Sequence, residues 1–320
     1  MTRQIIVIAG PTAVGKTKYA IETALELNGE IVSCDSMQCY KYMDIGSAKP
    51  TKAELSMVRH HLVDIIDPAG DFSVAQYQKL AKEAIEDIFS RGKIPIIAGG
   101  TGLYLNSILY DMDFSDVPKD DELRLTLEKE AQLFGPEYIY EKLKNKDSEA
   151  AARIHPNNVK KIIRALEAAQ YGSKVRDFKN CTKKCKDYER ILTGLTRNRD
   201  ELYDRINKRV DILVQEGLFK EVEDLLEMGL TEDDISMKGI GYKEIIAYFD
   251  GLYTKEETID LIKKNTRHLA KRQLTWFRRY EDMHWFNISN YADDQTAVKE
   301  LISWLKSKLE YTTKATSRTI

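Results

Sequence analysis

Short apolar runs alternate with amphipathic stretches over the first third of the chain. Residues 4–9, 31–34 and 94–98 are almost continuously apolar, which is typical of strands buried on both faces of a parallel sheet. Residues 16–28 and 73–91 instead place apolar side chains at helical spacing. This alternation predicts an α/β fold in which helices flank a parallel sheet.

The pattern changes after Leu109. An acidic, proline-bearing segment follows, and the apolar positions then have helical spacing as far as about Tyr171. A lysine-rich stretch precedes the apolar run at 191–195, which predicts a further strand of the sheet. Helical spacing resumes at 198–216, 218–228, 240–249 and 255–280. We therefore expect an α/β core of residues 1–114 and 190–310, an inserted all-helical domain of 115–189 and a disordered tail of 311–320.

The composition is that of a globular protein. Hydrophobic residues make up 42% of the 320 positions, which is enough to fill a sizeable core. No segment approaches the roughly 20 apolar residues of a membrane span, and the N-terminus has no basic stretch followed by an apolar run. We therefore expect a cytoplasmic protein without a membrane segment, whose cysteines are reduced and bind no metal. These cysteines are Cys34, Cys39, Cys181 and Cys185.

The first predicted strand runs directly into GPTAVGKT, which matches the G-x-x-x-x-G-K-[ST] pattern of a phosphate-binding loop (P-loop). In such a loop, backbone N–H groups and the positive end of the following helix bind phosphate oxygens. Lys16 would reach the outer phosphates, and the Thr17 hydroxyl would coordinate Mg²⁺. The pattern predicts a P-loop NTPase-like core that binds a diphosphate or triphosphate at Gly10, Pro11, Thr12, Ala13, Val14, Gly15, Lys16 and Thr17.

Two polar residues follow the other predicted strands of the first third. Asp35 comes after the strand at 31–34, and Thr101 lies among three glycines after the strand at 94–98. Ligands bind at the carboxyl ends of parallel strands, so both side chains are candidates for catalysis. Asp35 could coordinate Mg²⁺ or act as a general base, and it could also cap a helix together with Gln38. Thr101 could donate to a phosphate or to an acceptor, or the glycines could serve the turn alone.

Two further features have a structural alternative. Arg205 and Arg209 lie one helical turn apart, where they could hold a diphosphate or could pair with Glu201 or Asp204 of the same helix. The histidine pair at 60–61 has no cysteine nearby, and adjacent side chains point apart. We therefore expect these histidines to be hydrogen-bonded structural residues rather than metal ligands.

The net charge of −2 hides two basic tracts. From Arg153 to Arg190 there are eleven Lys or Arg against four Asp or Glu, and from Lys263 to Arg279 there are seven against none. Such tracts can follow the phosphates of an RNA backbone, and a solvated charged face is the alternative. In the second tract, four cations recur on one helical face: Lys264, Arg267, Lys271 and Arg278.

Together these motifs resemble those of bacterial tRNA dimethylallyltransferases, also called tRNA isopentenyltransferases. The resemblance covers nearly the whole chain and has small departures, such as Ser47 where the family usually has Thr. The motifs are GPTAVGKT at 10–17, DSMQCY at 35–40, DIGSAKP at 44–50, HHLVDI at 60–65, FSVAQY at 72–77, GGTGLY at 99–104, RIHPNNVKKIIRALE at 153–167, LYDRINKRVD at 202–211, GIGYKE at 239–244 and TRHLAKRQLTWFR at 266–278.

The resemblance implies transfer of a dimethylallyl group from dimethylallyl diphosphate to the exocyclic N6 amine of the adenosine 3′-adjacent to the anticodon. It implies that the P-loop, Mg²⁺ and either Arg205 or Arg209 hold the diphosphate. Asp35 would accept a proton or hydrogen bond from the amine, and Thr101 would position the base, which the family flips into a channel. The implied tRNA contacts are Asp35, Ser36, Met37, Gln38 and Thr101 in the core, Lys160, Lys161 and Arg164 in the insertion, and Lys264, Arg267, Lys271 and Arg278.

Other functions share parts of this pattern. An adenylate isopentenyltransferase would use free AMP or ADP as acceptor, but the long insertion and the basic tracts favour a macromolecule. A P-loop small-molecule kinase would need an arginine-rich lid, and the tract at 176–190 is lysine-rich instead. An RNA-binding module without transfer chemistry is a third alternative. We expect a monomer, because no apolar stripe is left without a place in the core.

Overall fold

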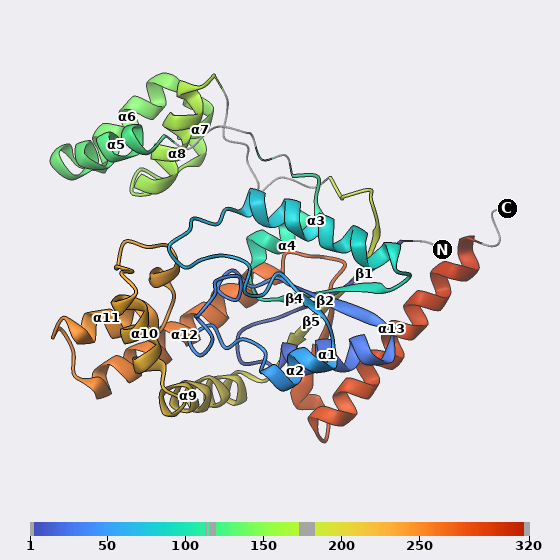
Figure 1. The fold of residues 1–320 in the computed structure, drawn as a ribbon. Coiled ribbons are helices and arrows are strands. Elements are labelled where there is room, and N and C mark those ends of the chain that lie inside the picture. Colours follow the sequence, from blue (N-terminus) through green and yellow to red (C-terminus); the bar gives the residue numbers. More distant parts are fainter. Residues whose placement is uncertain (1–2, 113, 115–119, 173–182, 317–320) are drawn as a thin grey trace. The chain divides into compact units, whose positions relative to one another are not determined.

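The structure is a computed structural model that describes residues 3–112, 114, 120–172 and 183–316. The chain forms two compact units (Figure 1). The first combines Met1–Tyr110 with Lys184–Ile320, and the second is Asp111–Lys183. Each unit has a hydrophobic core of its own. The second unit overlaps the helical insertion expected at 115–189, but its bounds differ, because residues 111–114 group with it and residues 184–189 group with the first unit.

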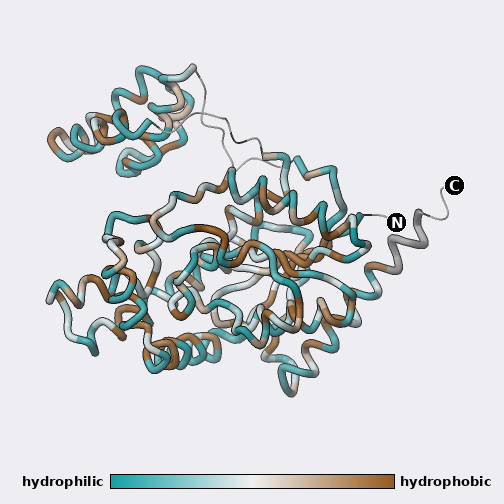
Figure 2. Tube along the Cα trace, viewed as in Figure 1, coloured by the Kyte–Doolittle hydropathy of each residue, from teal (hydrophilic) through white to brown (hydrophobic). Residues whose placement is uncertain are grey.

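The first unit is built on one parallel sheet. Its strands are β1 (Gln4–Ala9), β2 (Gly29–Ser33), β3 (His60–His61), β4 (Ile94–Gly99), β5 (Glu189–Thr196) and β6 (His284–Asn287). The spatial order is β3-β2-β4-β1-β5-β6, with every neighbouring pair parallel. The central strands are buried on both faces, which is why their sequences are continuous apolar runs. Figure 2 shows hydrophobic residues gathered along these strands.

Helices cover both faces of this sheet. They are α1 (Lys16–Glu26), α2 (Lys52–Met57), α3 (Val74–Ser90), α4 (Gly102–Leu109), α9 (Arg199–Gln215), α10 (Leu218–Glu227), α11 (Tyr242–Phe249), α12 (Lys255–Phe277) and α13 (Asp294–Thr316). Ile5 and Val7 of β1 pack in the core that contains α3, α4, α10 and α11, whereas Ile6 and Ile8 pack with α1, α9 and α13. This division follows the two-residue period of a strand, which sends successive side chains to opposite faces.

The loops after β1, β2, β4 and β5 all begin at the carboxyl ends of their strands. Because the strands are parallel, these ends lie together along one border of the sheet, the carboxyl edge. Backbones approach so closely here that two positions accept only glycine. A Cβ atom on Gly99 would lie 2.0 Å from the carbonyl oxygen of Cys34, and one on Gly10 would lie 2.7 Å from that of Leu195. Because ligands of open parallel sheets bind at this edge, it is the place for a functional site.

The second unit is a small helical bundle. Its helices are α5 (Asp121–Phe134), α6 (Pro136–Lys146), α7 (Ser148–Arg153) and α8 (Val159–Gln170). Leu127, Ile139 and Leu143 are among the apolar residues that fill its core. Buried Glu167 accepts hydrogen bonds from the Arg124 guanidinium at 2.8 and 2.9 Å. The unit is therefore held together by apolar packing and by one buried carboxylate that pairs with Arg124 and Arg164.

The α/β fold class predicted from the sequence is confirmed. The strands predicted at 4–9, 31–34, 94–98 and 191–195 correspond to β1, β2, β4 and β5. The short strands β3 and β6 were not predicted, because two and four partly polar residues leave no apolar run. The disordered tail expected from 311 is wrong as far as Thr316, because helix α13 continues to that residue. This helix is anchored by Leu301 and Leu305 in the core, and helix propagation from a packed segment costs little.

Glu30, near the start of β2, is a buried carboxylate with several charged partners. Arg91 donates to it at 2.8 Å, Lys93 at 2.9 Å, and Nε2 of His61 lies 2.8 Å away. The Arg91 guanidinium, together with His61 and Lys93, holds the pKa of Glu30 well below its usual range. His60 contacts the Val58 carbonyl through Nδ1 at 2.9 Å. Both histidines are therefore hydrogen-bonded within the fold, as the sequence analysis expects.

We expect Glu30→Ala to lower the free energy of unfolding by about 3 kcal/mol, because it leaves the Arg91 and Lys93 charges without their buried partner. Since folding lowers the pKa of Glu30, its contribution is present above the unfolded value of 4.5 and is lost as the pH falls below it. Urea unfolding at neutral and acidic pH measures both effects. Asp87→Ala, which removes an exposed partner of Arg91, is the control, and an equal loss in both variants would contradict the prediction.

Candidate functional site

The P-loop connects β1 to the start of α1. Ala13 and Gly15 have φ angles of +62° and +112°, a left-handed backbone that tightens the turn. Lys16 Nζ donates a 2.9 Å hydrogen bond to the Pro11 carbonyl oxygen. Burial lowers the pKa of Lys16 to about 8, and the negative charge of Asp35 acts in the opposite direction. The P-loop lysine and Asp35 therefore interact electrostatically at the carboxyl edge of the sheet.

Two arginines donate to carbonyl groups of the same loop. Arg197, which directly follows β5, donates through Nε to the Val14 oxygen at 3.2 Å, and its other nitrogens pair with two carboxylates. Arg205 in α9 donates through Nε to the Ala13 oxygen at 3.1 Å. The loop is thus fixed from outside by side chains that are far from it in the sequence.

Arg209 lies one turn further along α9 and also points to this edge. Its Nη2 donates to the Ala48 carbonyl oxygen at 3.5 Å. Burial lowers the pKa of Arg209, and Asp35 counteracts this shift as it does for Lys16. Asp35 is therefore the carboxylate that favours the charged form of both partly buried cations.

The carboxylates that could have paired with Arg205 or Arg209 within α9, Glu201 and Asp204, bind other cations instead. Glu201 forms an ion pair with Arg197, and Asp204 forms one with Lys208 at 2.8 Å. Arg205 and Arg209 instead contact the P-loop and the loop after β2. The structure brings both to the predicted site and does not choose between them.

Asp35 stands in a tight turn after β2. Its Oδ1 accepts the Met37 N–H at 3.0 Å, and its Oδ2 makes no hydrogen bond within the described ranges. The helix cap considered for Asp35 and Gln38 is wrong, because these residues are not followed by a helix. The Gln38 amide instead accepts from Ser33 Oγ at 3.0 Å and donates to the Ala48 oxygen at 3.4 Å. One carboxylate oxygen of Asp35 remains available to a ligand.

Thr101 links the loop after β4 to the loop after β2. Its hydroxyl accepts the Ser36 N–H at 3.0 Å, and its own N–H donates to the Cys34 carbonyl oxygen at 3.0 Å. It also precedes α4 without capping it through its side chain. Thr101 therefore lies next to Ser36 and Asp35, as their common place at the carboxyl edge predicts.

Gln273 of α12 is a site residue that the sequence analysis did not find. Its Oε1 accepts the Thr12 N–H of the P-loop at 2.8 Å, and its Nε2 donates to the Gly100 carbonyl oxygen at 3.0 Å. A Cβ atom on Gly100 would lie 2.4 Å from that nitrogen, so the glycine makes room for the amide. One side chain thus joins the P-loop to the loop that carries Thr101.

Thr17 is the candidate magnesium ligand. Its hydroxyl makes no hydrogen bond to any residue that the structure describes, and no cluster of metal-binding side chains exists in the same part of the chain. Mg²⁺ prefers oxygen ligands, keeps several waters and commonly binds substrate phosphates. The residues present fit a magnesium ion held by Thr17 and a bound diphosphate, and do not fit a metal held by protein alone.

The predicted RNA-contacting cations divide into two groups. Lys264, Lys271 and Arg278 are exposed along or just after α12, and Lys160 and Lys161 are exposed at the start of α8. Two others have structural partners: Arg267 donates to Asn207 Oδ1 at 2.6 Å, and Arg164 forms an ion pair with buried Glu167. Residues 173–182 of the first basic tract, with Cys181, lie outside the described residues. Cys34, Cys39 and Cys185 are free thiols.

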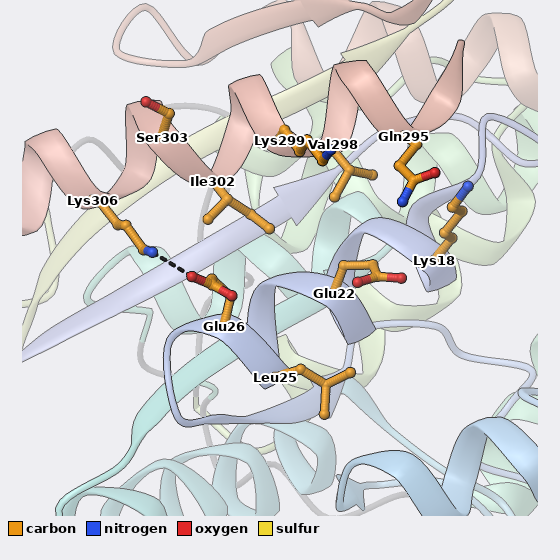
Figure 3. Close-up of a pocket in the computed structure, with 10 residues that line it drawn as sticks. All are labelled: Lys18, Glu22, Leu25, Glu26, Gln295, Val298, Lys299, Ile302, Ser303 and Lys306. Atoms are coloured by element: carbon orange, nitrogen blue, oxygen red, sulfur yellow. Dashed lines mark hydrogen bonds and ion pairs between the residues drawn. The ribbon is translucent and has the colours of Figure 1, made fainter.

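A groove of about 750 Å³ between α1 and α13 is separate from this site (Figure 3). Lys18, Glu22 and Leu25 line it from α1, and Lys306 of α13 pairs with Glu26 across it. None of the residues predicted for phosphate, catalysis or RNA lines the groove. The residues predicted for chemistry therefore lie away from this groove.

The family model described as IPP transferase matches residues 38–280, which is more than half of the chain. The chain belongs to the IPP transferase family. The matched range contains Thr101, Arg205, Arg209 and Gln273, while the P-loop and Asp35 precede it. No helix in the described residues is long and apolar enough to span a membrane.

Curated relatives and solved structures agree with this assignment. The tRNA dimethylallyltransferase of Alkaliphilus oremlandii (strain OhILAs) is 54% identical over 292 residues, covering 91% of this chain and 93% of the relative. The tRNA isopentenylpyrophosphate transferase of Bacillus halodurans has a TM-score of 0.75 at 43% identity, with 98% and 99% of the two chains covered. A eukaryotic dimethylallyltransferase acting on tRNA has a TM-score of 0.81 at 26% identity, with 97% and 80% covered. The resemblance drawn from the sequence motifs is confirmed.

Affinity for inorganic diphosphate should fall as the pH rises through about 8, because Lys16 loses its proton in this range. Titration calorimetry with Mg²⁺ present measures the effect. Lys16→Arg keeps its charge throughout, so its affinity should depend less on pH. The diphosphate itself titrates identically with both proteins, so the difference in slope isolates Lys16. Equal slopes for the two proteins would contradict the assignment.

Gln273→Glu should weaken diphosphate binding and lower the free energy of unfolding by about 1–3 kcal/mol. The carboxylate can still accept the Thr12 N–H, but it faces the Gly100 carbonyl oxygen without a proton to donate. Calorimetry and urea unfolding measure the two losses. Thr275→Ala, an exposed change in the same helix, is the control, and a Gln273→Glu protein that matches it would show that the bridge is dispensable.

Proposed function

We propose that the chain is a tRNA dimethylallyltransferase that prenylates the N6 amine of the adenosine 3′-adjacent to the anticodon. Its donor is dimethylallyl diphosphate, and its products are N6-isopentenyladenosine in tRNA and diphosphate. The names of its relatives support this function. The observation that carries it in the structure is one carboxylate, Asp35, which interacts electrostatically with the partly buried cations Lys16 and Arg209.

This arrangement suits transfer of an allylic group. As the carbon–oxygen bond of the donor breaks, negative charge grows on the departing diphosphate, and fixed cations and loop N–H groups stabilise it. The exocyclic amine attacks the allylic carbon, forms the new carbon–nitrogen bond and loses a proton. Asp35 accepts that proton through its Oδ2 atom. Bond making, bond breaking and proton transfer then balance without hydrolysis of a nucleoside triphosphate.

Two groups of residues would hold the donor. The P-loop residues 10–17 would bind the diphosphate through backbone N–H groups and Lys16. Arg205 and Arg209 both point to this edge, so both can bind diphosphate oxygens. When bound, Mg²⁺ would neutralise diphosphate charge, with Thr17 as its protein ligand.

The acceptor would bind at the loops after β2 and β4. Thr101 would position the flipped adenine, with Ser36, Met37 and Gln38 along the RNA strand. Phosphates of the tRNA would meet the exposed cations, which are Lys264, Lys271 and Arg278 in the core 1–114 and 190–310, and Lys160 and Lys161 in the insertion 115–189. Arg267 and Arg164 would contribute as far as their protein partners allow. We further propose that the enzyme works as a cytoplasmic monomer.

The alternative functions have less support. An adenylate isopentenyltransferase would share the donor site but would not need the helical unit, and the relatives are named for tRNA. A P-loop small-molecule kinase would need an arginine-rich lid, whereas the tract at 176–190 is lysine-rich, and the relatives are named as dimethylallyltransferases.

The deciding experiment is incubation with dimethylallyl diphosphate, Mg²⁺ and unmodified tRNA, followed by mass spectrometry of the digested nucleosides. Parallel reactions contain AMP or ATP in place of tRNA. We expect prenylated adenosine from tRNA only. Asp35→Asn should lose at least about a hundredfold in the transfer rate, because it removes the proton acceptor and the charge that favours the charged forms of Lys16 and Arg209. It should still bind tRNA, because the side chain keeps its shape. Prenylated AMP, or phosphate transfer from ATP, would overturn the proposal.

A further inference from the structure

Glu221 of α10 holds three successive backbone N–H groups of the loop at 44–50. Its Oε2 accepts from Asp44 at 2.8 Å and from Ile45 at 2.7 Å, and its Oε1 accepts from Gly46 at 2.9 Å. The Tyr242 hydroxyl also donates to Oε1, at 2.8 Å. Four donors thus meet one carboxylate, and hydrogen bonds to an ionised acceptor are about twice as strong as neutral ones.

These contacts leave the loop little freedom. A Cβ atom on Gly46 would lie 2.5 Å from the Tyr242 ring, so the ring packs directly on the loop backbone. The Ala48 N–H donates to the Ile45 carbonyl oxygen at 2.9 Å, and Ala48 has a left-handed φ of +49°. The position of the Ala48 carbonyl group is therefore set by the segment that Glu221 holds.

The Ala48 carbonyl oxygen in turn accepts hydrogen bonds from two residues of the proposed site. Arg209 Nη2 lies 3.5 Å from it, and Gln38 Nε2 lies 3.4 Å from it. Arg209 is partly buried and its charge interacts with Asp35, so a shift of its guanidinium would change the cationic side of the site. A continuous set of contacts leads from Glu221 through the loop to both side chains.

We infer that Glu221 is a positioning residue of the transferase: it fixes the loop at 44–48 and thereby orients Arg209 toward the diphosphate and Gln38 toward the RNA. This inference rests on the proposed function, in which Arg209 binds the donor and Gln38 contacts the acceptor. In that function, Glu221 itself would contact neither the donor nor the acceptor. A glutamine at this position would turn an amide NH₂ toward N–H donors, so the charge as well as the shape of the side chain is required.

The test compares Glu221→Gln with Glu223→Gln, an exposed change in the same helix. The first measurement is hydrogen exchange of the Ile45 and Gly46 amides, which should become at least about tenfold faster in Glu221→Gln only. The second is the dissociation constant of inorganic diphosphate with Mg²⁺, which should rise about tenfold. If Glu221→Gln does not fold, Tyr242→Phe removes a single hydrogen bond and should show smaller changes of the same kind. Unchanged amide exchange in the folded variant would overturn the inference.

A double-variant cycle separates positioning from a general structural role. Arg209→Lys should weaken diphosphate binding, and adding Glu221→Gln should weaken it no further, because Glu221 acts through Arg209. Additive losses would mean that Glu221 only supports the fold. Diphosphate binding requires no acceptor, so these results stand apart from the product assay. If the wild type makes no prenylated tRNA, the proposed function fails, whereas a Glu221→Gln protein that binds diphosphate normally refutes the positioning role alone.

Discussion

The site depends on how the carbonyl groups of the P-loop are bound by side chains. The loop is irregular backbone at the edge of a sheet, and its peptide dipoles would repel an anion wherever oxygens face inward. Three cationic side chains bind carbonyl groups of this backbone from different sides. Lys16, Arg205 and Arg197 donate to the carbonyl oxygens of Pro11, Ala13 and Val14, respectively. In the proposed function, the loop with these carbonyl groups engaged would present its N–H groups to the diphosphate.

Burial of these cations has an electrostatic cost that the site itself offsets. Burial lowers the pKa of both Lys16 and Arg209, the charge of Arg209 lowers that of Lys16 further, and the charge of Arg205 lowers that of Arg209. Asp35 favours the charged form of both, so the carboxylate that would accept the proton also keeps the diphosphate side of the site charged. In the proposed function, the proton acceptor and the cations that bind the leaving group are therefore electrostatically coupled. Arginine at position 209 suits this arrangement, because a guanidinium keeps its proton when it is buried.

The sequence predicts those parts of the site that are local in the chain. The P-loop, Asp35 and Thr101 each follow an apolar strand, and strand ends are visible in a single sequence. Gln273 and Glu221 have no such signal, because their partners lie 261 and 175 to 177 residues away. Periodicity places them on a buried helix face and does not say which loop that face meets. Charge patterns have the same limit: Arg267 belongs to a basic stripe in the sequence, yet in the structure it binds Asn207.

Helix α12 shows why one element can serve both substrates. Gln273 is two residues from Lys271, so the two side chains project about 200° apart around the helix. The inner side chain bridges the P-loop and the loop of Thr101, while the outer one is exposed. In the proposed function, tRNA phosphates meet the outer face and the donor loop meets the inner one. In that function the width of a rigid α-helix, rather than a mobile loop, would set the spacing between the two substrates.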